Sequence, residues 1–383
     1  MYKENFNKTK IVATIGPATS SKEKLTDLIK AGVDVCRLNF SHGAQEIHAD
    51  VASKIREINK EIGSHTAILQ DLQGPKLRIG KVDGVINLTD GKSIRVTTQQ
   101  KTSTIDELSV SYPTLAQEAN VGDRILLNDG KVELQISEIV DDHTLNTNII
   151  VGGPLTSNKG FNLPNTNISA PCLTEKDLRD LDFGLELDVD WVALSFVRRP
   201  EDVIELKNII SQKGKRAKVI AKIEKPEAVE NIEEIVKVTD AIMVARGDLG
   251  VEVPLQRVPL IQKNIVDICI KNAKPVIIAT QMMESMIEDS MPTRAEITDV
   301  ANAVIDGADA VMLSAETSVG KYPIRVVEIM NDIISDIEKD SRVYYKGEKP
   351  RSTSPSFPSD EVCFTAVRMS DHLQAKAVVA MTK

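Results

Sequence analysis

A repeating unit of strand and helix decides the fold, and it is clearest in residues 218–250, KVIAKIEKPEAVENIEEIVKVTDAIMVARGDLG. Two short apolar runs rich in β-branched residues flank a stretch with helical periodicity, which opens with Pro226. Proline is tolerated at that position because the first turn of a helix leaves its N–H groups without intrahelical partners. A strand followed by a helix and a second strand indicates a βαβ unit with parallel strands.

The same unit recurs along the chain and predicts eight parallel strands. They are expected at Lys10–Gly16, Asp34–Phe40, Thr66–Leu72, Trp191–Val197, Lys218–Glu224, Ala241–Leu249, Pro275–Gln281 and Ala310–Glu316. Eight consecutive βα units close a (β/α)₈ barrel. A doubly wound open sheet is the alternative, but the chain has no glycine-rich dinucleotide fingerprint. We therefore predict an α/β fold of the TIM-barrel type.

The pattern breaks after the third strand, where residues 79–170 contain short alternating strands. Three Asp-Gly pairs, at 83–84, 90–91 and 129–130, are hairpin signals. We expect an inserted all-β, barrel-like domain that leaves from the catalytic face of the barrel and is positioned as a lid. The catalytic barrel domain then comprises residues 1–78 and 171–345.

The C-terminal residues predict a linker and the start of another domain. Residues 346–360 are rich in Pro and Ser, which is typical of an interdomain linker. Residues 361–383 predict one helix, Glu361–Leu373, and one strand, Ala377–Met381. One helix and one strand cannot bury a core of their own. We expect a truncated, incomplete α/β domain there.

Composition limits the classes of function. The net charge of -9 argues against a broad nucleic-acid surface, because phosphate backbones are bound by surplus Lys and Arg. No apolar run approaches the roughly 18 to 20 residues that span a bilayer. The four cysteines lie far apart without zinc-ligand spacing, as expected for reduced thiols. We expect a cytoplasmic protein that binds neither nucleic acid nor a membrane.

Polar residues gather at the expected carboxyl ends of the strands. They are Arg37, Asn39 and Ser41, Asp71, Lys222 and Glu224, Arg246 and Asp248, Thr280, and Ser314 and Glu316. Residues two apart in a strand share a face, and TIM-barrel catalytic groups come from several strand ends. Glu224 and Asp248 suit Mg²⁺, although two carboxylates are also the pattern of a general acid and base. Lys222 and Arg37 beside them favour the metal and a phosphorylated acid.

Motifs at these strand ends resemble those of pyruvate kinases. They are ATIGPA (13–18), RLNFSHG (37–43), KIE (222–224), MVARGDLG (243–250), ATQM (279–282), ESM (284–286), PTRAE (292–296) and LSAET (313–317). The resemblance runs through the whole chain in order, including the insertion after the third strand. It implies phosphoryl transfer from phosphoenolpyruvate to ADP, giving ATP and pyruvate, which is the last step of glycolysis.

The resemblance also implies roles for individual residues. Glu224 and Asp248 hold Mg²⁺, or Mn²⁺ in its place, while Arg37 and Lys222 neutralise the transferring phosphoryl group. Thr280 lies near the substrate and the path of proton delivery, with Ser314 and Glu316 as supporting groups and the main chain of Gly247 in contact with substrate. The nucleotide contacts implied are Asn39, His42, Arg78 and, from the lid, Lys159.

One departure from the family pattern concerns potassium. Many pyruvate kinases have Asp-Thr-Lys-Gly-Pro-Glu where this chain has Asp71-Leu72-Gln73-Gly74-Pro75-Lys76. The glutamate of the common form accompanies a K⁺ ion held by groups like Asn39, Ser41, Asp71 and the carbonyl of Leu72. Here Lys76 replaces that glutamate, and its ammonium is expected to supply the charge that K⁺ otherwise brings. We predict that K⁺ is dispensable.

The family resemblance also bears on the assembly of the protein. The resemblance implies a homo-oligomer, which we expect to be a dimer through the barrels and a tetramer if the C-terminal domain were complete.

Two rival functions fit some of the same residues. A magnesium-dependent barrel lyase or aldolase is one rival, but it has no need of a lid that carries Lys159. An inactive protein or binding module is the other, and the intact Lys222, Glu224, Asp248 and Thr280 argue against it.

Overall fold

The computed structural model describes residues 7–340, 343, 357–373, 375, 378 and 379. The chain divides into two compact units, Met1–Lys339 and Asp340–Lys383. Across the described ranges, no helix combines the length and the apolar character needed to cross a bilayer.

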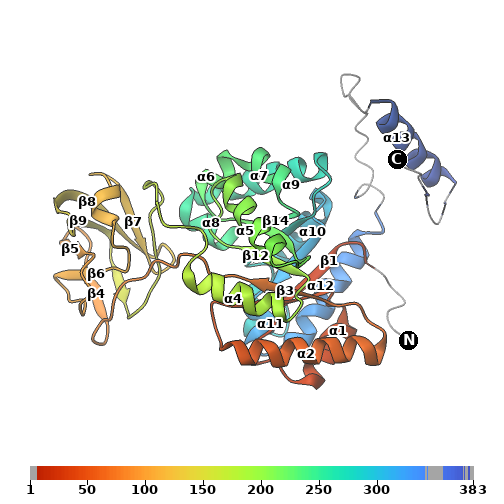
Figure 1. Cartoon of the computed structure of the whole chain (residues 1–383), viewed down its shortest axis with the longest axis horizontal. Coiled ribbons are helices and arrows are strands. Elements are labelled where there is room, and N and C mark those ends of the chain that lie inside the picture. The colour runs from red at the N-terminus through yellow and green to blue at the C-terminus, as the bar shows by residue number, and fades with distance from the viewer. Residues whose placement is uncertain (1–6, 341–342, 344–356, 374, 376–377, 380–383) are drawn as a thin grey trace. The chain divides into compact units, whose positions relative to one another are not determined.

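Eight parallel strands form a closed barrel, which confirms the predicted fold class (Figure 1). They are β1 (Lys10–Thr14), β2 (Val35–Asn39), β3 (Ala67–Asp71), β12 (Trp191–Leu194), β13 (Lys218–Ile223), β14 (Ala241–Ala245), β15 (Val276–Ala279) and β16 (Ala310–Leu313). The last strand, β16, pairs with β1, so every barrel strand has two neighbours. Closure leaves no unpaired edge in this sheet.

Both faces of the barrel strands are buried, which explains their continuous apolar runs. Ala241 and Met243 point into the barrel together with Val12, Leu69, Ala193, Ile220, Ile277 and Met312. Their neighbours Ile242 and Val244 are also fully buried, on the other face of the same strand. The barrel interior is therefore a packed core, and only residues at its ends can reach a ligand.

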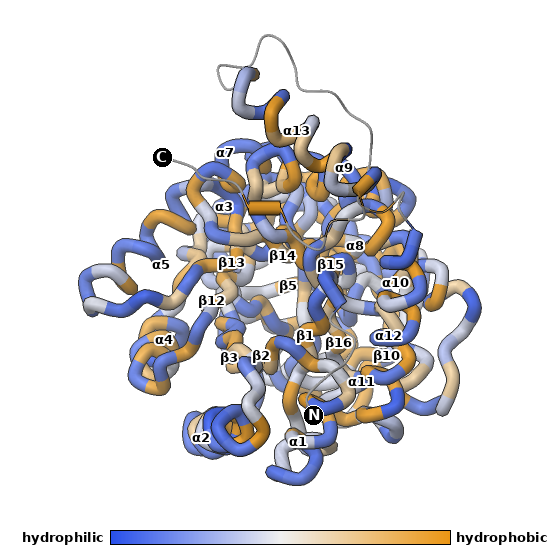
Figure 2. The backbone as a smooth tube through the Cα atoms, turned by 90° about the vertical axis from the view of Figure 1, so that its right-hand side faces the viewer, coloured by the Kyte–Doolittle hydropathy of each residue, from blue (hydrophilic) through white to orange (hydrophobic). Residues whose placement is uncertain are grey.

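Helices surround the strands, as the tube in Figure 2 shows. They are α1 (Lys22–Ala31), α2 (Gln45–Ile62), α4 (Glu175–Glu186), α5 (Pro200–Gln212), α6 (Pro226–Glu230), α7 (Ile232–Val238), α8 (Arg246–Glu252), α9 (Val258–Lys271), α10 (Arg294–Asp306), α11 (Ala315–Ser318) and α12 (Pro323–Ile337), with 3₁₀ turns η1 (Leu255–Arg257) and η2 (Glu284–Ile287). Three of these helices, α5, α6 and α12, begin with proline, where the missing N–H group leaves no intrahelical bond unmade.

Every barrel strand ends before its predicted last residue, and in two cases a helix begins inside the predicted strand. Strand β14 stops at Ala245 and α8 begins at Arg246, while β16 stops at Leu313 and α11 begins at Ala315. The prediction that Arg246 shares a strand face with Asp248, and Ser314 with Glu316, is therefore wrong. With 3.6 residues per helical turn, side chains two positions apart point to nearly opposite sides of the helix.

The insertion after β3 has its own sheets and its own core. It contains β4 (Ile86–Leu88), β5 (Ser93–Thr97), β6 (Glu107–Ser109), α3 (Leu115–Glu118), β7 (Arg124–Leu127), β8 (Val132–Asp141), β9 (Thr144–Val151), β10 (Gly153–Leu155) and β11 (Phe161–Asn162). One sheet has the order β11-β7-β8-β9-β5-β6, and β10 pairs with β4. Apolar side chains such as Ile94, Leu108 and Leu134 form a separate buried cluster. The predicted inserted all-β region is confirmed.

Only one of the three Asp-Gly signals closes a hairpin. The pair at 129–130 joins β7 to β8, whose Leu127 and Val132 face each other. The pair at 90–91 lies between β4 and β5, but β4 pairs with β10 and β5 pairs with β9 and β6. A turn motif bends the chain locally, whereas packing of the whole insertion chooses the strand partners.

The described part of the second unit contains helix α13 (Phe357–His372). It begins four residues before the predicted helix and so includes the end of the predicted linker. The remainder of that linker lies outside the described residues. The strand predicted at residues 377–381 lies outside them as well, apart from 378 and 379, which are in no strand.

A glycine in α4 provides a test of barrel packing. A Cβ atom at Gly184 would lie 2.1 Å from Oε1 of Gln70, a fully buried side chain whose Nε2 donates to the carbonyl of Asp180 at 2.6 Å. Helix propensity favours Gly184→Ala by about 1 kcal/mol, but overpacking costs roughly 1–3 kcal/mol. We expect a net loss of stability in urea unfolding. The control Gly160→Ala, whose nearest atom is 4.0 Å away, should show no such loss.

Candidate active site

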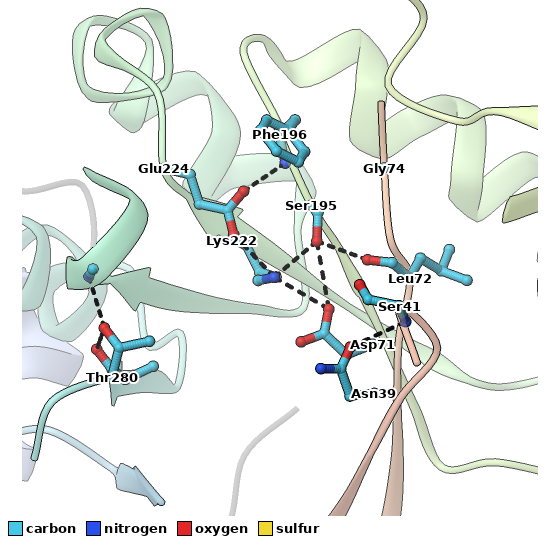
Figure 3. Close-up of polar contacts among 12 residues, drawn as sticks. Asn39, Ser41, Asp71, Leu72, Gly74, Ser195, Phe196, Lys222, Glu224 and Thr280 are labelled. Atoms are coloured by element: carbon cyan, nitrogen blue, oxygen red, sulfur yellow. Dashed lines mark hydrogen bonds and ion pairs between the residues drawn. The ribbon is translucent and has the colours of Figure 1, made fainter. Parts of the chain in front are cut away.

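Four charged side chains meet at the carboxyl ends of β2, β3 and β13. Asp71 accepts a hydrogen bond from Nε of Arg37 at 2.7 Å through one oxygen and from Nζ of Lys222 at 3.2 Å through the other. Lys222 also lies 2.9 Å from the Glu224 carboxylate. All four residues are at least nine-tenths buried. Figure 3 shows Asp71, Lys222 and Glu224 turned toward one another.

The charges of this cluster stabilise one another. Burial alone would raise the pKa of Asp71, but the charges of Lys222 and Arg37 bring it below its ordinary value. Burial would likewise lower the pKa of Lys222, yet Asp71 and Glu224 raise it well above the usual lysine range. Lys222 is therefore a permanent cation at neutral pH. It is suited to stabilising negative charge rather than to donating a proton.

The sequence reasoning missed Ser195 and Phe196, which follow β12. The Ser195 hydroxyl accepts a hydrogen bond from Lys222 Nζ at 2.8 Å and donates one to the Leu72 carbonyl at 2.7 Å. The Phe196 N–H donates to Glu224 at 3.0 Å, from a backbone with φ of +57°. Their position after a barrel strand could have indicated them. All the remaining barrel strands except β1 contributed candidate site residues at this position.

Asp248 lies in the first turn of α8 and faces a pocket shared with Lys76, Phe196 and Glu252. Its side chain is exposed to that pocket. Partial removal of the Asp248 carboxyl group from water raises its pKa above the ordinary aspartate value, and the negative charge of Glu224 raises it further. Mutual repulsion of this kind is relieved by a divalent cation, so the two carboxylates fit a magnesium ion.

A cation there would need further ligands. Among the described residues, no group of three or more His, Cys, Asp or Glu side chains is arranged to hold a metal. Magnesium commonly binds through one or two carboxylates together with substrate oxygens and water. The Glu224–Asp248 pair therefore fits a metal ion whose other ligands are substrate oxygens and water.

Thr280 follows β15 in a strained conformation. Its φ of +70° is unusual for a β-branched residue and costs about 1–3 kcal/mol. Its hydroxyl accepts a hydrogen bond from the Gly247 N–H at 2.7 Å and donates to the Ala279 carbonyl at 2.6 Å. Arg246 donates to the Thr280 carbonyl at 2.8 Å and pairs with Asp299. Arg246 thus supports the Thr280 loop instead of facing the same way as Asp248.

Ser314 and Glu316 occupy the start of α11. The buried Glu316 carboxylate accepts hydrogen bonds from the backbone N–H of Ser314 at 2.6 Å and of Met283 at 3.3 Å. Burial raises the pKa of this carboxyl group. Its contacts join α11 to the segment that follows Thr280.

A second pocket lies beside Arg37 and contains two of the predicted nucleotide contacts, Asn39 and His42. Segments around Gly16 and Ser318 line the same pocket. His42 is exposed, and partial burial together with the charges of Lys76, Arg78 and Arg37 lowers its pKa. It is therefore neutral at pH 7 and can hydrogen-bond without adding charge.

The other two predicted nucleotide contacts lie next to each other where the insertion joins the barrel. Arg78 forms a β-bridge with Gly160, and its guanidinium donates to the Asn158 carbonyl at 2.6 Å. The Ile79 N–H donates to the Lys159 carbonyl at 2.9 Å. The structure therefore brings Arg78 and Lys159 together across eighty positions of sequence.

Three of the four groups predicted to hold K⁺ already have protein partners. Asp71 binds Arg37 and Lys222, the Leu72 carbonyl accepts from Ser195, and the Asn39 side chain accepts from the Ser41 N–H at 3.1 Å. Burial lowers the pKa of the Lys76 ammonium, the charge of Arg78 lowers it further, and Asp248 opposes both.

Comparison with known proteins identifies the family. Residues 6–327 match the profile of the pyruvate kinase barrel domain. The chain belongs to the pyruvate kinase family. It is 50% identical over 375 residues to a pyruvate kinase of Mycobacterium intracellulare, and 49% identical over 376 residues to one of Corynebacterium glutamicum. Each alignment covers 98% of this chain and 78% of the relative.

A solved structure agrees with this membership. A pyruvate kinase from Cryptosporidium parvum superposes with a TM-score of 0.87 at 36% identity, covering 97% of this chain and 77% of that one. The chain is therefore a phosphotransferase of the pyruvate kinase family, as its motifs indicated. The lyase or aldolase alternative receives no support from these similarities.

Replacing Asp71 tests whether one carboxylate organises the site. Asp71→Asn preserves shape but leaves Arg37 and Lys222 as buried cations without their shared anion, which should cost about 3–5 kcal/mol of stability. Thermal and urea unfolding will measure the loss. The exposed Asp83→Asn changes net charge equally and should unfold like the wild type. Equal stability of the two variants would contradict a central role for Asp71.

Proposed function

We propose that this pyruvate kinase transfers the phosphoryl group of phosphoenolpyruvate to ADP in a reaction that depends on Mg²⁺ but not on K⁺. The observation that carries the proposal is the buried contact of Arg37 and Lys222 with the Asp71 carboxylate. It holds two cations side by side at the mouth of the barrel. Cations held in advance stabilise the charge of a transferring phosphoryl group without reorganising during the reaction.

In the proposed reaction, the bond between phosphorus and the enol oxygen of phosphoenolpyruvate breaks. A new bond forms between phosphorus and a terminal phosphate oxygen of ADP. Arg37 and Lys222 neutralise charge on the phosphoryl oxygens during this exchange. The enolate that remains takes up a proton at its methylene carbon and becomes pyruvate. Thr280 is proposed to lie on that proton path, with Ser314 and Glu316 in support and the main chain of Gly247 against the substrate.

The metal is proposed to bind at Glu224 and Asp248. When bound, Mg²⁺, or Mn²⁺ in its place, supplies positive charge to the phosphate and enolate oxygens. The Phe196 N–H keeps the Glu224 carboxylate oriented, since it donates to one of its oxygens. Lys222 contacts the other oxygen of the same carboxylate. The ligand is therefore held in place by protein groups before a cation binds.

Potassium is proposed to be dispensable because the chain carries its own cation. Three of the groups that match the family's K⁺ ligands, the Asn39 and Asp71 side chains and the Leu72 carbonyl, are hydrogen-bonded within the protein. Lys76 lines the same pocket as Asp248, so its ammonium is placed to add positive charge there. Both observations support a site that reaches its charge balance without a monovalent ion.

The remaining assignments are also proposals. We infer that ADP contacts Asn39 and His42 in the pocket beside Arg37, and Arg78 and Lys159 at the insertion. The domain bounds 1–78 with 171–345, 79–170, 346–360 and 361–383, the homo-oligomeric assembly and a cytoplasmic location stay predictions.

The whole proposal is tested by pyruvate formation from phosphoenolpyruvate and ADP, and Lys222→Met tests the main residue. Loss of one such charge-stabilising group should lower kcat by at least about 100-fold. A coupled lactate dehydrogenase assay measures the rate, and circular dichroism checks the fold. Lys92→Met, on the exposed surface of the insertion, is the matched control and should retain activity. Unchanged turnover in Lys222→Met would refute its role.

The potassium proposal predicts similar initial rates in sodium-free and potassium-free buffer with and without KCl. Lys76→Glu restores the common residue of the family, so its rate should fall without K⁺ and recover when KCl is added. Lys81→Glu reverses an exposed charge nearby in sequence and should show no K⁺ response. A wild-type rate that rises by orders of magnitude with KCl would overturn the proposal.

A further inference from the structure

A second buried charge pair lies directly behind the candidate metal ligands. Lys225 follows Glu224 in the chain, and its ammonium lies 2.7 Å from the carboxylate of Glu252. Glu252 is the last residue of α8, one turn after Asp248, so the two side chains share a face of that helix. The pair exposes only 7% and 1% of its side chains. Each member of this pair is therefore close in sequence to one candidate metal ligand. Lys225 directly follows Glu224, and Glu252 lies four residues after Asp248.

The inserted β domain reaches the same carboxylate. Asn162, at the end of β11, donates from its side-chain amide to Oε1 of Glu252 at 2.7 Å. The same oxygen thus accepts from a barrel residue, Lys225, and from a residue of the insertion. The contact closes one side of the pocket into which Asp248 faces.

This arrangement is costly as a purely structural device. Burying two charges removes their hydration, and apolar side chains of similar volume often stabilise a core as well or better. The other oxygen of Glu252, Oε2, is buried without a hydrogen-bond partner. An unsatisfied buried carboxylate oxygen adds a further desolvation cost. The stability of the barrel therefore does not account for the arrangement.

We propose that Glu252 is a positioning residue that couples the inserted domain to divalent-cation affinity. Lys225 and the backbone of α8 connect Glu252 to Glu224 and Asp248, while Asn162 connects it to the insertion. When Asn162 binds Glu252, the two carboxylates are held in the arrangement that accepts a cation. By linkage, a bound cation favours the same position of the insertion. The inference rests on the proposed metal function of Glu224 and Asp248.

The decisive variant is Asn162→Leu, which removes the contact from the insertion and leaves the Lys225–Glu252 pair in place. The matched control is Arg198→Met. Arg198 also ties the insertion to the barrel, since its guanidinium donates to the carbonyls of Ile168 and Ala170, but it does not contact Glu252. Both variants loosen the same junction, and only one acts on the carboxylate.

Binding of Mn²⁺ alone to the full chain is measured by electron paramagnetic resonance of the free ion, together with the Mg²⁺ concentration for half-maximal activity and the melting temperature. Loss of a group that orients a metal ligand typically weakens metal binding about 10- to 100-fold. We expect a rise in the Mn²⁺ dissociation constant of at least about 10-fold for Asn162→Leu, and little change for Arg198→Met. Asn162→Ser, a smaller polar replacement, should lie between wild type and Asn162→Leu and serves if the leucine variant misfolds.

Two results would overturn the coupling. In one, Asn162→Leu is less stable but binds Mn²⁺ like the wild type, so the contact is structural only. In the other, Arg198→Met weakens Mn²⁺ binding as much as Asn162→Leu does. Glu224→Gln separates this inference from the proposed function. If Glu224→Gln binds Mn²⁺ normally, the metal assignment itself fails.

Discussion

A single buried carboxylate, that of Asp71, sets the conditions for the rest of the site. It lies at the end of β3 and binds Arg37 from β2 and Lys222 from β13. Two cations at nine-tenths burial or more are tolerable because this anion and Glu224 compensate them. The two cations and the two anions balance one another, so the anions keep the N–H donors of Arg37 and Lys222 at the mouth of the barrel. The packed core beneath them limits how far either cation can move.

The loops after the strands position their residues by entering helices or strained turns at once. Asp248 belongs to the first turn of α8, and Thr280 adopts a left-handed backbone that Gly247 and Arg246 hold through hydrogen bonds. Backbone strain of this type persists only where surrounding contacts overcome it. The N–H group of Phe196 and the carboxylate of Glu316 have similar positioning roles. Each of these groups at the mouth of the barrel is thus held by hydrogen bonds within the protein.

The insertion after β3 adds groups that the barrel does not supply. Lys159 and Asn162 belong to the insertion and lie where it meets the barrel. The Lys159 carbonyl accepts from the Ile79 N–H, and Asn162 binds a carboxylate one helical turn from Asp248. A domain with its own hydrophobic core can hold such groups as a unit. Any change in its position would alter both the proposed nucleotide contacts and the surroundings of the proposed metal ligands. The proposed coupling of substrate and cation binding therefore needs no group beyond those of the barrel and the insertion.

Much of this protein follows from sequence. The alternation of apolar strands and amphipathic helices predicts the barrel, because both strand faces must be buried, and the polar strand ends identify Arg37, Asp71, Lys222 and Glu224. Sequence periodicity could not show that β14 and β16 stop before Arg246 and Ser314, since the same residues fit a strand or a helix locally. It also missed Ser195 and the Asn162–Glu252–Lys225 contact, whose members are far apart in the chain. Residue types are a local property and can be predicted, but strand partners and buried charge pairs are chosen by packing between distant segments, which only the tertiary structure decides.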